Sequence, residues 1–187
     1  MNNTSISHEI TIEELVNRIV ANASERLQEH GAIPATCICL GAHRTVQWTA
    51  RSLPNAEAVV EFANDCRLLC VGEAATAAVF VAQVTLGCDR PLAIKASGSS
   101  ANSGPEYLLI QVELDGGQNQ THMVPILPGT GGRPKLGNAR VLLNRLLTGI
   151  TKALLPKTTP TEAERSNARL AIQQNPRLAG YNPFQSN

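Results

Sequence analysis

The sequence predicts an α+β fold: a mostly antiparallel, five-stranded sheet covered by helices in the order α-β-β-α-β-β-β-α, with a C-terminal basic arm. Apolar residues recur at helical spacing in separate segments, and short β-branched runs joined by tight or flexible loops lie between them. The 187 residues, 43% of them hydrophobic, suffice for one core and a tail. We therefore expect a flexible N-terminus at 1–9, a single α+β domain at 10–151 and the arm at 152–187.

The first helix is expected to begin after Thr11. Thr11 and Glu14 form the S/T-x-x-E capping box, in which each side chain accepts a hydrogen bond from the other residue's backbone amide. His30 and Gly31 supply a left-handed stop. The apolar stripe between these ends comprises Ile12, Leu15, Val16, Ile19, Val20, Ala23 and Leu27. One face of this helix should therefore be packed.

Two short apolar runs, 35–40 and 45–50, indicate antiparallel strands with a tight connection. A second helix is expected over about 55–69, closed by Gly72. The run 75–86 begins rich in alanine, which suits a helix, and continues with Val, Phe and Thr, which suit a strand. We predict a strand.

The clearest strand pair joins 107–114 to 121–127. Asp115-Gly116-Gly117 lies between them, and glycine accepts the positive φ of tight turns without a Cβ clash. The small, polar segment 95–104 is expected to be a loop between paired strands.

A third helix is expected from its cap, Asn138, to about residue 150, with leucines on one side and polar residues on the other. The order of elements over about residues 10–150 resembles that of the roadblock/longin-like and profilin-like layouts, which serve widely as interaction and dimerisation modules. The resemblance lies in the order alone, with no shared motif, and such an analogy does not establish function.

Four prolines punctuate the chain beyond Lys152 and leave room for one short helix at about 161–174. Thr161 and Glu164 repeat the capping-box pattern of the first helix. This helix has few apolar residues, so it needs a partner to be stable.

Charge is divided unevenly along the chain. Residues 1–127 contain 7 Lys and Arg against 13 Asp and Glu, a net charge of −6, whereas residues 128–187 contain 9 against 2, a net charge of +7. A basic end on an acidic body can meet phosphates, an anionic membrane surface or the acidic face of another subunit.

We favour a non-enzymatic assembly or adaptor protein that self-associates and docks through its basic C-terminal arm. An acidic body and a basic arm are complementary between copies, so we expect a homo-oligomer or a protein partner with an acidic surface. Leu178, Tyr181 and Phe184 are the predicted arm anchors, because large apolar side chains fill grooves.

Nucleic-acid binding is the alternative interpretation of the basic end. The phosphates would be contacted by basic residues of the third helix and its approach, namely Arg133, Lys135, Arg140, Arg145 and Lys152. Against this function stand the acidic body, an aromatic content of only 3% and the lack of any nucleic-acid-binding motif in the sequence.

The loop 128–137 supports a second alternative, an enzyme or a binder of a small anion. Its glycines and the amino end of the predicted third helix would attract an anion, with His122 as a nearby base. The loop is not a Walker motif, because Pro134 replaces the glycine required before Lys135. A plain strand-to-helix connection is the favoured interpretation. The glycines in question are Gly129, Gly131 and Gly132.

The cysteines include two spaced pairs. Cys37 and Cys39 lie two apart on a predicted strand, and Cys66 and Cys70 lie four apart on a predicted helix, so each pair faces one way. If that helix covers that face of the sheet, four thiols converge, with Cys88 nearby, and a tetrahedral zinc site is conceivable. Neither pair has the zinc-ribbon spacing. We therefore favour cysteines that act as small core hydrophobes, and predict no metal.

No catalytic residue and no cofactor are predicted. The sequence contains no apolar run long enough to span a membrane. Five cysteines are an odd number without a disulfide-rich spacing, which favours a reducing compartment. We expect a cytoplasmic protein.

Overall fold

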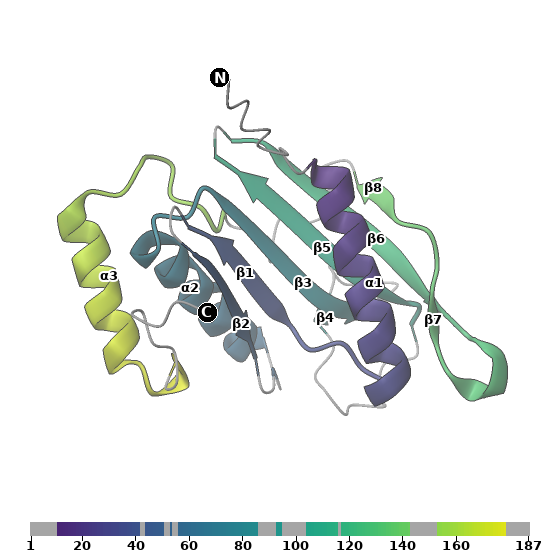
Figure 1. The fold of residues 1–187 in the computed structure, drawn as a ribbon. Coiled ribbons are helices and arrows are strands. Elements are labelled where there is room, and N and C mark those ends of the chain that lie inside the picture. The colour runs from purple at the N-terminus through teal and green to yellow at the C-terminus, as the bar shows by residue number, and fades with distance from the viewer. Residues whose placement is uncertain are drawn as a thin grey trace, which may run out of the picture.

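The computed structural model describes residues 11–41, 44–50, 53, 56–85, 93–94, 104–115, 117–142 and 153–178. The helices of these residues are α1 (Ile12–His30), α2 (Ala56–Gly72) and α3 (Glu162–Gln174), with 3-10 turns at Thr130–Gly132 and Pro176–Leu178. The strands are β1 (Thr36–Leu40), β2 (Thr45–Thr49), β3 (Ala77–Thr85), β4 (Ala93–Ile94), β5 (Glu106–Leu114), β6 (Asn119–Leu127), β7 (Lys135–Leu136) and β8 (Arg140–Leu142). The predicted α+β class is confirmed (Figure 1).

The strands pair in antiparallel fashion in the order β2-β1-β3-β5-β6-β7, while β4 pairs with β3 and β8 pairs with β6. All nine residues of β3 are buried, because this strand has neighbours on both sides and helices on both faces. The run from which it forms is thus a strand, as predicted. The predicted count of five strands is wrong, because β4, β7 and β8 extend the sheet.

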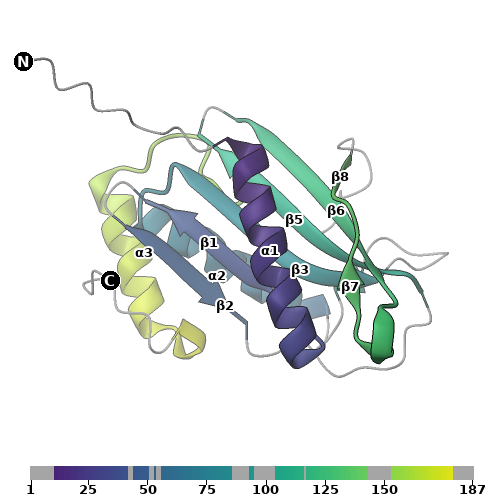
Figure 2. The same cartoon turned by 45° about the vertical axis from the view of Figure 1, so that its right-hand side comes forward.

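The helices lie on opposite faces of the sheet (Figures 1 and 2). α1 buries Val16, Ile19 and Leu27 against residues of β3, β5 and β6, among them Val79 and Ile110. α2 covers the other face, where a second apolar cluster contains cysteines of β1 and α2. This arrangement places the helix with Cys66 and Cys70 over the strand with Cys37 and Cys39.

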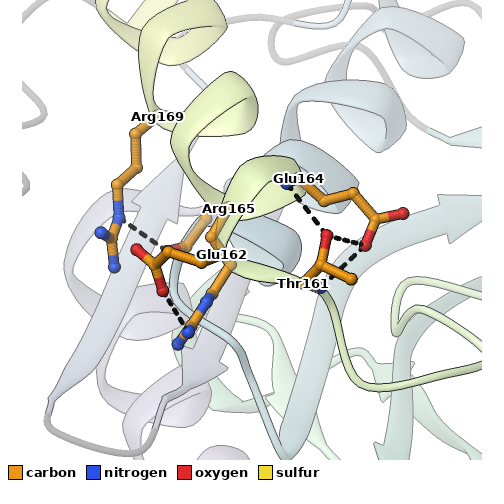
Figure 3. Close-up of polar contacts among 6 residues, drawn as sticks. Thr161, Glu162, Glu164, Arg165 and Arg169 are labelled. Atoms are coloured by element: carbon orange, nitrogen blue, oxygen red, sulfur yellow. Dashed lines mark hydrogen bonds and ion pairs between the residues drawn. The ribbon is translucent and has the colours of Figure 1, made fainter.

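Local signals placed the ends of two helices correctly. The capping box of Thr11 and Glu14 starts α1, and Gly31 ends it in the left-handed conformation, at φ 71°. The capping box of Thr161 and Glu164 starts α3 (Figure 3). On the same first turn, Arg165 forms an ion pair with Glu162.

The third helix expected from Asn138 is not found at its start, because Arg140–Leu142 form strand β8. Residues 135–142 turn back along β6, so that Lys135 lies opposite Leu127 and Arg140 lies opposite Met123. The backbone hydrogen bonds gained along β6 replace those that a helix would make. The rest of the expected helix, residues 143–150, lies outside the described residues.

The C-terminal segment, defined here as residues 153–178, folds back onto α2. Leu154, Ile172 and Leu178 are buried in the same apolar cluster as the cysteines. The short helix expected at about 161–174 is therefore confirmed as α3, and its partner is α2 of the same chain. Figure 1 shows α3 beside α2, away from α1.

Candidate functional site

Four cysteines meet between β1 and α2. Cys37 and Cys39 alternate on β1 and face the helix, while Cys66 and Cys70 lie one turn apart on the face of α2 turned to the sheet. All four side chains have an exposed fraction of 0%. The convergence that the spacing made conceivable is thus found. Cys88 lies outside the described residues.

The sulfur atoms are close together. The Sγ atoms of Cys39 and Cys70 are 3.3 Å apart, and those of Cys37 and Cys39 are 3.7 Å apart. Cys37, Cys39 and Cys70 all have their sulfur atoms within 4.8 Å of one another. Cys66 contacts Cys37, but its sulfur atom lies outside this group of three. We call these four residues the cysteine cluster.

The thiols polarise one another. Hydrogen bonds from Cys37 and Cys70 lower the pKa of Cys39 to about 5, because they stabilise its thiolate. The hydrogen bond with Cys39 raises the pKa of Cys37, and hydrogen bonds with Cys37 and Cys39 raise the pKa of Cys70. Burial raises the pKa of Cys66. The proton of each thiol in the cluster therefore depends on its neighbours.

The residues that follow β1 and α2 contact each other beside the cluster. Arg44 donates hydrogen bonds to both carboxylate oxygens of Glu73, from Nε at 2.8 Å and from Nη2 at 2.6 Å. Gly41 permits the approach, because a Cβ at this position would lie 2.7 Å from the carbonyl oxygen of Glu73. These contacts join the chain just after β1 to the end of α2, two residues past Cys39 and three residues past Cys70.

The C-terminal segment covers the outer side of α2. Arg169 donates a hydrogen bond from Nε to the carbonyl oxygen of Gly72 at 2.9 Å, just past the last cysteine of the helix. Arg177 forms ion pairs with Glu61 and Asp65, at 2.9 Å and 3.1 Å. The basic charge of the segment thus meets acidic residues of the same chain, and α2 is held between the segment and the sheet.

A buried carboxylate fixes the start of the C-terminal segment. Glu113 on β5 is only 4% exposed and accepts hydrogen bonds from the backbone amides of Leu154, at 2.7 Å, and Leu155, at 3.0 Å. Gln111 donates a further hydrogen bond to its other oxygen. The carboxylate of Glu113 is occupied by backbone donors, which is a structural role.

A cavity of about 530 Å³ lies between the C-terminal segment and the turn that joins β5 to β6. Its lining includes Asp115, Lys157 and Thr158 as well as one edge of Glu113. Among the lining residues there is no histidine or cysteine that could serve as a nucleophile or as a base near neutral pH. We assign no chemistry to it.

The basic residues suggested for binding anions lie at the far edge of the sheet. Arg133, Lys135 and Arg140 are exposed, in the turn after β6, in β7 and in β8. Arg145 and Lys152 lie outside the described residues. The structure therefore places the first three of the five predicted positions along β7, β8 and the turn before them, and not on a helix.

The glycines of the loop 128–137 build a turn between strands. Gly131 and Gly132 have φ values of 69° and 76°, which only glycine adopts readily. A Cβ on Gly129 would lie 2.1 Å from the carbonyl oxygen of Arg133. No helix begins within the described residues after this loop, through Leu142. The loop therefore lacks the helix dipole on which the anion cradle depended.

His122 is separated from this loop. It lies opposite Ile110 and Val141 in the sheet, whereas the loop follows the other end of β6. The side chain is 7% exposed, and burial lowers its pKa. Its Nε2 atom has no hydrogen-bond partner among the described residues. Nothing here pairs it with a nucleophile.

The three predicted arm anchors have different outcomes. Leu178 is 1% exposed and packs in the apolar cluster that contains the cysteines. Tyr181 and Phe184 lie outside the described residues. One anchor is thus placed, in a groove of its own chain.

Comparison of the chain with protein-family models, with curated proteins and with solved structures gives no match. Among the described residues, no helix is both long enough and apolar enough to cross a membrane. The cysteine cluster was visible in the spacing of the sequence. What the sequence lacked was the packing of α2 on β1, which depends on contacts some thirty residues apart.

Proposed function

We propose that the protein is a non-enzymatic assembly module that docks a partner protein through the first part of its basic end, the strands β7 and β8. The partner supplies an acidic, extended segment that adds to the edge of the sheet. The observation that carries this proposal is the exposure of Arg133, Lys135 and Arg140 in the turn before β7, in β7 and in β8, beyond which no described strand is paired.

An edge strand offers free backbone groups to an incoming strand, which is a common mode of peptide recognition. No described strand pairs with the outer side of β7 or β8. Large apolar side chains are exposed beside the cations: Val141 at 60% and Leu127 at 40%. An incoming segment would therefore find backbone partners and an apolar contact on one edge.

The positive charge of the edge formed by β7 and β8 favours a partner segment that is acidic. None of the ion pairs formed among the described residues involves Arg133, Lys135 or Arg140. Pairing of this edge with the same edge of a second copy would bring like charges together, which is unfavourable. An acidic segment would instead neutralise the three cations and gain speed of association from them.

A nucleic acid fits the edge less well. Sequence-independent binding of single strands relies on aromatic side chains that stack on bases. The described aromatic residues Trp48, Phe62, Phe80 and Tyr107 are buried or half-buried, and none lies on β7 or β8. Cations beside exposed valine and leucine match a peptide better than a phosphate backbone.

The test is fluorescence anisotropy of the full chain with a labelled peptide of alternating glutamate and valine, at low and at moderate salt. We expect saturable binding that weakens with salt. The variant R133E/K135E/R140E should lose it, by at least tenfold in affinity. The matched control is R18E/R26E, which reverses two exposed charges on α1.

Three outcomes oppose the proposal. Binding of a labelled single-stranded oligonucleotide but not of the peptide would favour the nucleic-acid alternative. A salt-sensitive dimer that the triple variant abolishes would make a second copy the occupant. Absence of any interaction with the peptide would remove the edge as an acidic docking site.

A further inference from the structure

We propose that Cys37, Cys39, Cys66 and Cys70 bind one Zn²⁺ ion between β1 and α2. The ion would occupy the centre of the cysteine cluster, with two ligands from the strand and two from the helix. The site would be structural, because four protein ligands close the coordination of zinc and leave no position for water or substrate.

The distances among three of the sulfur atoms fit a single tetrahedral ion, and Cys66, which contacts Cys37, would move toward the ion as the fourth ligand. Zinc–sulfur bonds of about 2.3 Å place the sulfur atoms of a tetrahedron about 3.8 Å apart. The Cys37–Cys39 and Cys39–Cys70 distances of 3.7 Å and 3.3 Å are near this edge length. A set of three sulfur atoms within 4.8 Å of one another leaves room for one ion and not for a cluster of several irons.

Ordinary core packing accounts less well for the cluster. Buried cysteines do behave as small hydrophobes. Carbon atoms in a core pack at about 3.5–4.0 Å, and the larger sulfur atoms of Cys39 and Cys70 approach to 3.3 Å. Every cysteine that the structure describes lies at this one point, from two separate elements. Apolar packing gives no reason for four thiols to gather.

The surrounding structure supplies a rigid and dry site. Arg44, just before β2, forms two hydrogen bonds with Glu73, just after α2. The cluster has an exposed fraction of 0%, and α3 packs on the outer side of α2. Rigid ligands shielded from water favour a permanent ion.

Four sulfur ligands select a soft, tetrahedral ion. Thiolates favour zinc over the hard cations magnesium and calcium, which bind oxygen. On binding, each ligating thiol transfers its proton to solvent and its sulfur donates an electron pair to Zn²⁺, so no oxidation or reduction occurs. The ion would bind the folded chain more tightly than the unfolded one, and so raise its stability.

The first experiment measures metal in the full-length protein, purified without chelator from medium supplemented with zinc. Inductively coupled plasma mass spectrometry should find about one zinc per chain. Release should follow titration of the thiols with a mercurial reagent. A metal content near zero, with no zinc taken up by the reduced protein, would overturn the proposal, and so would stoichiometric iron.

The second experiment uses Co²⁺ as a spectroscopic probe of the full chain. Tetrahedral thiolate coordination gives intense visible bands and sulfur-to-cobalt charge-transfer bands, which disappear when Zn²⁺ is added. We expect these bands from wild type and from C88S, because Cys88 is not among the four proposed ligands. The variants C39S and C70S should lose them.

Cysteine variants in the core can fail to fold, so a third experiment tests zinc binding with the wild-type protein alone. The Tm of the reduced protein should fall when zinc is removed by a chelator and recover when zinc is restored. A Tm unaffected by the chelator, together with a cobalt spectrum free of charge-transfer bands, would show that the four cysteines are core hydrophobes only.

Discussion

Arg177 donates two hydrogen bonds to the carboxylate of Asp65, from Nε and from Nη2, each at 3.1 Å, although the two residues are 112 positions apart. The Asp65 side chain is almost buried, whereas that of Arg177 is about half exposed, at 49%. Asn175 donates a third hydrogen bond to the same carboxylate. A buried charge on α2 is therefore satisfied entirely by the end of the C-terminal segment.

Replacement of Arg177 should destabilise the protein. R177A leaves the buried carboxylate of Asp65 with only Asn175 as a side-chain partner, and a buried acceptor that loses its donor costs about 1–3 kcal/mol. Urea unfolding followed by circular dichroism measures the change. R165A is the matched control, because Arg165 pairs with the exposed Glu162 and such pairs are worth about 0–1 kcal/mol.

A double-mutant cycle separates the pair from its surroundings. In the background of D65N the buried charge is absent, so R177A should cost clearly less than in wild type. Equal costs in both backgrounds would mean that Arg177 acts through Glu61 or through packing, and that the contact with Asp65 is energetically neutral.

Glu113 should control whether the C-terminal segment stays attached. E113A removes the acceptor for the amides of Leu154 and Leu155 and should cost about 1–3 kcal/mol. Hydrogen exchange should show faster exchange of these two amides, since local opening precedes global unfolding. N119A, at an exposed position of the neighbouring strand, should leave both rates unchanged.

The milder variant E113Q refines this prediction. An amide oxygen can still accept from both backbone amides, and Gln111 can turn its own oxygen toward the new amide group. We therefore expect a smaller loss of stability than for E113A. If the two variants exchanged equally fast, the carboxylate charge and not its acceptor geometry would hold the segment.

The parts of the fold that sequence could predict depend on local signals. The capping boxes at Thr11 and Thr161 join residues only three apart, and both start helices as expected. The two cysteine pairs are also local, because strand and helix periods alone fix which way each pair faces. The sequence could predict that the two pairs meet only if the second helix packs on the first strand.

Contacts between distant segments were missed. Leucines at helical spacing favoured a third helix, yet Arg140–Leu142 pair with β6 instead, and strand pairing gives no signal within a short window. Glu113 has no local signal of its role, because the backbone amides that it binds lie 41 and 42 positions away. The charge distribution of the sequence identified the basic residues of the edge, but it did not predict that β7 and β8 are strands.

Acid should destabilise the protein through His122. Burial lowers the folded-state pKa below the ordinary value of 6.5, so the unfolded chain binds the proton more tightly. The stability that neutral His122 contributes is complete above pH 6.5 and is lost as the pH falls toward the folded-state pKa. Urea unfolding at pH 7.5 and pH 5.5 measures the loss.

The variant H122M removes the titrating group and fills a similar volume with an apolar side chain. It should lose less stability between the two pH values than wild type. H30Q replaces the exposed His30 at the end of α1 and should behave as wild type. Equal losses in wild type and H122M would assign the acid sensitivity to carboxylates.

Truncation should show that the C-terminal segment belongs to the core. A chain ending at residue 151 lacks Leu154, Ile172 and Leu178, which are 5%, 1% and 1% exposed in the intact structure. Loss of one large buried side chain costs about 2–5 kcal/mol, and whole domains have about 5–15 kcal/mol of stability. The shortened chain should therefore melt without a cooperative transition and bind the dye ANS.

A chain ending at residue 178 keeps all three side chains and the contact of Arg177 with Asp65, so it should unfold at the same temperature as the full chain. A cooperative transition in the chain ending at 151 would instead place the segment outside the folding unit, where its charge would be available to another molecule.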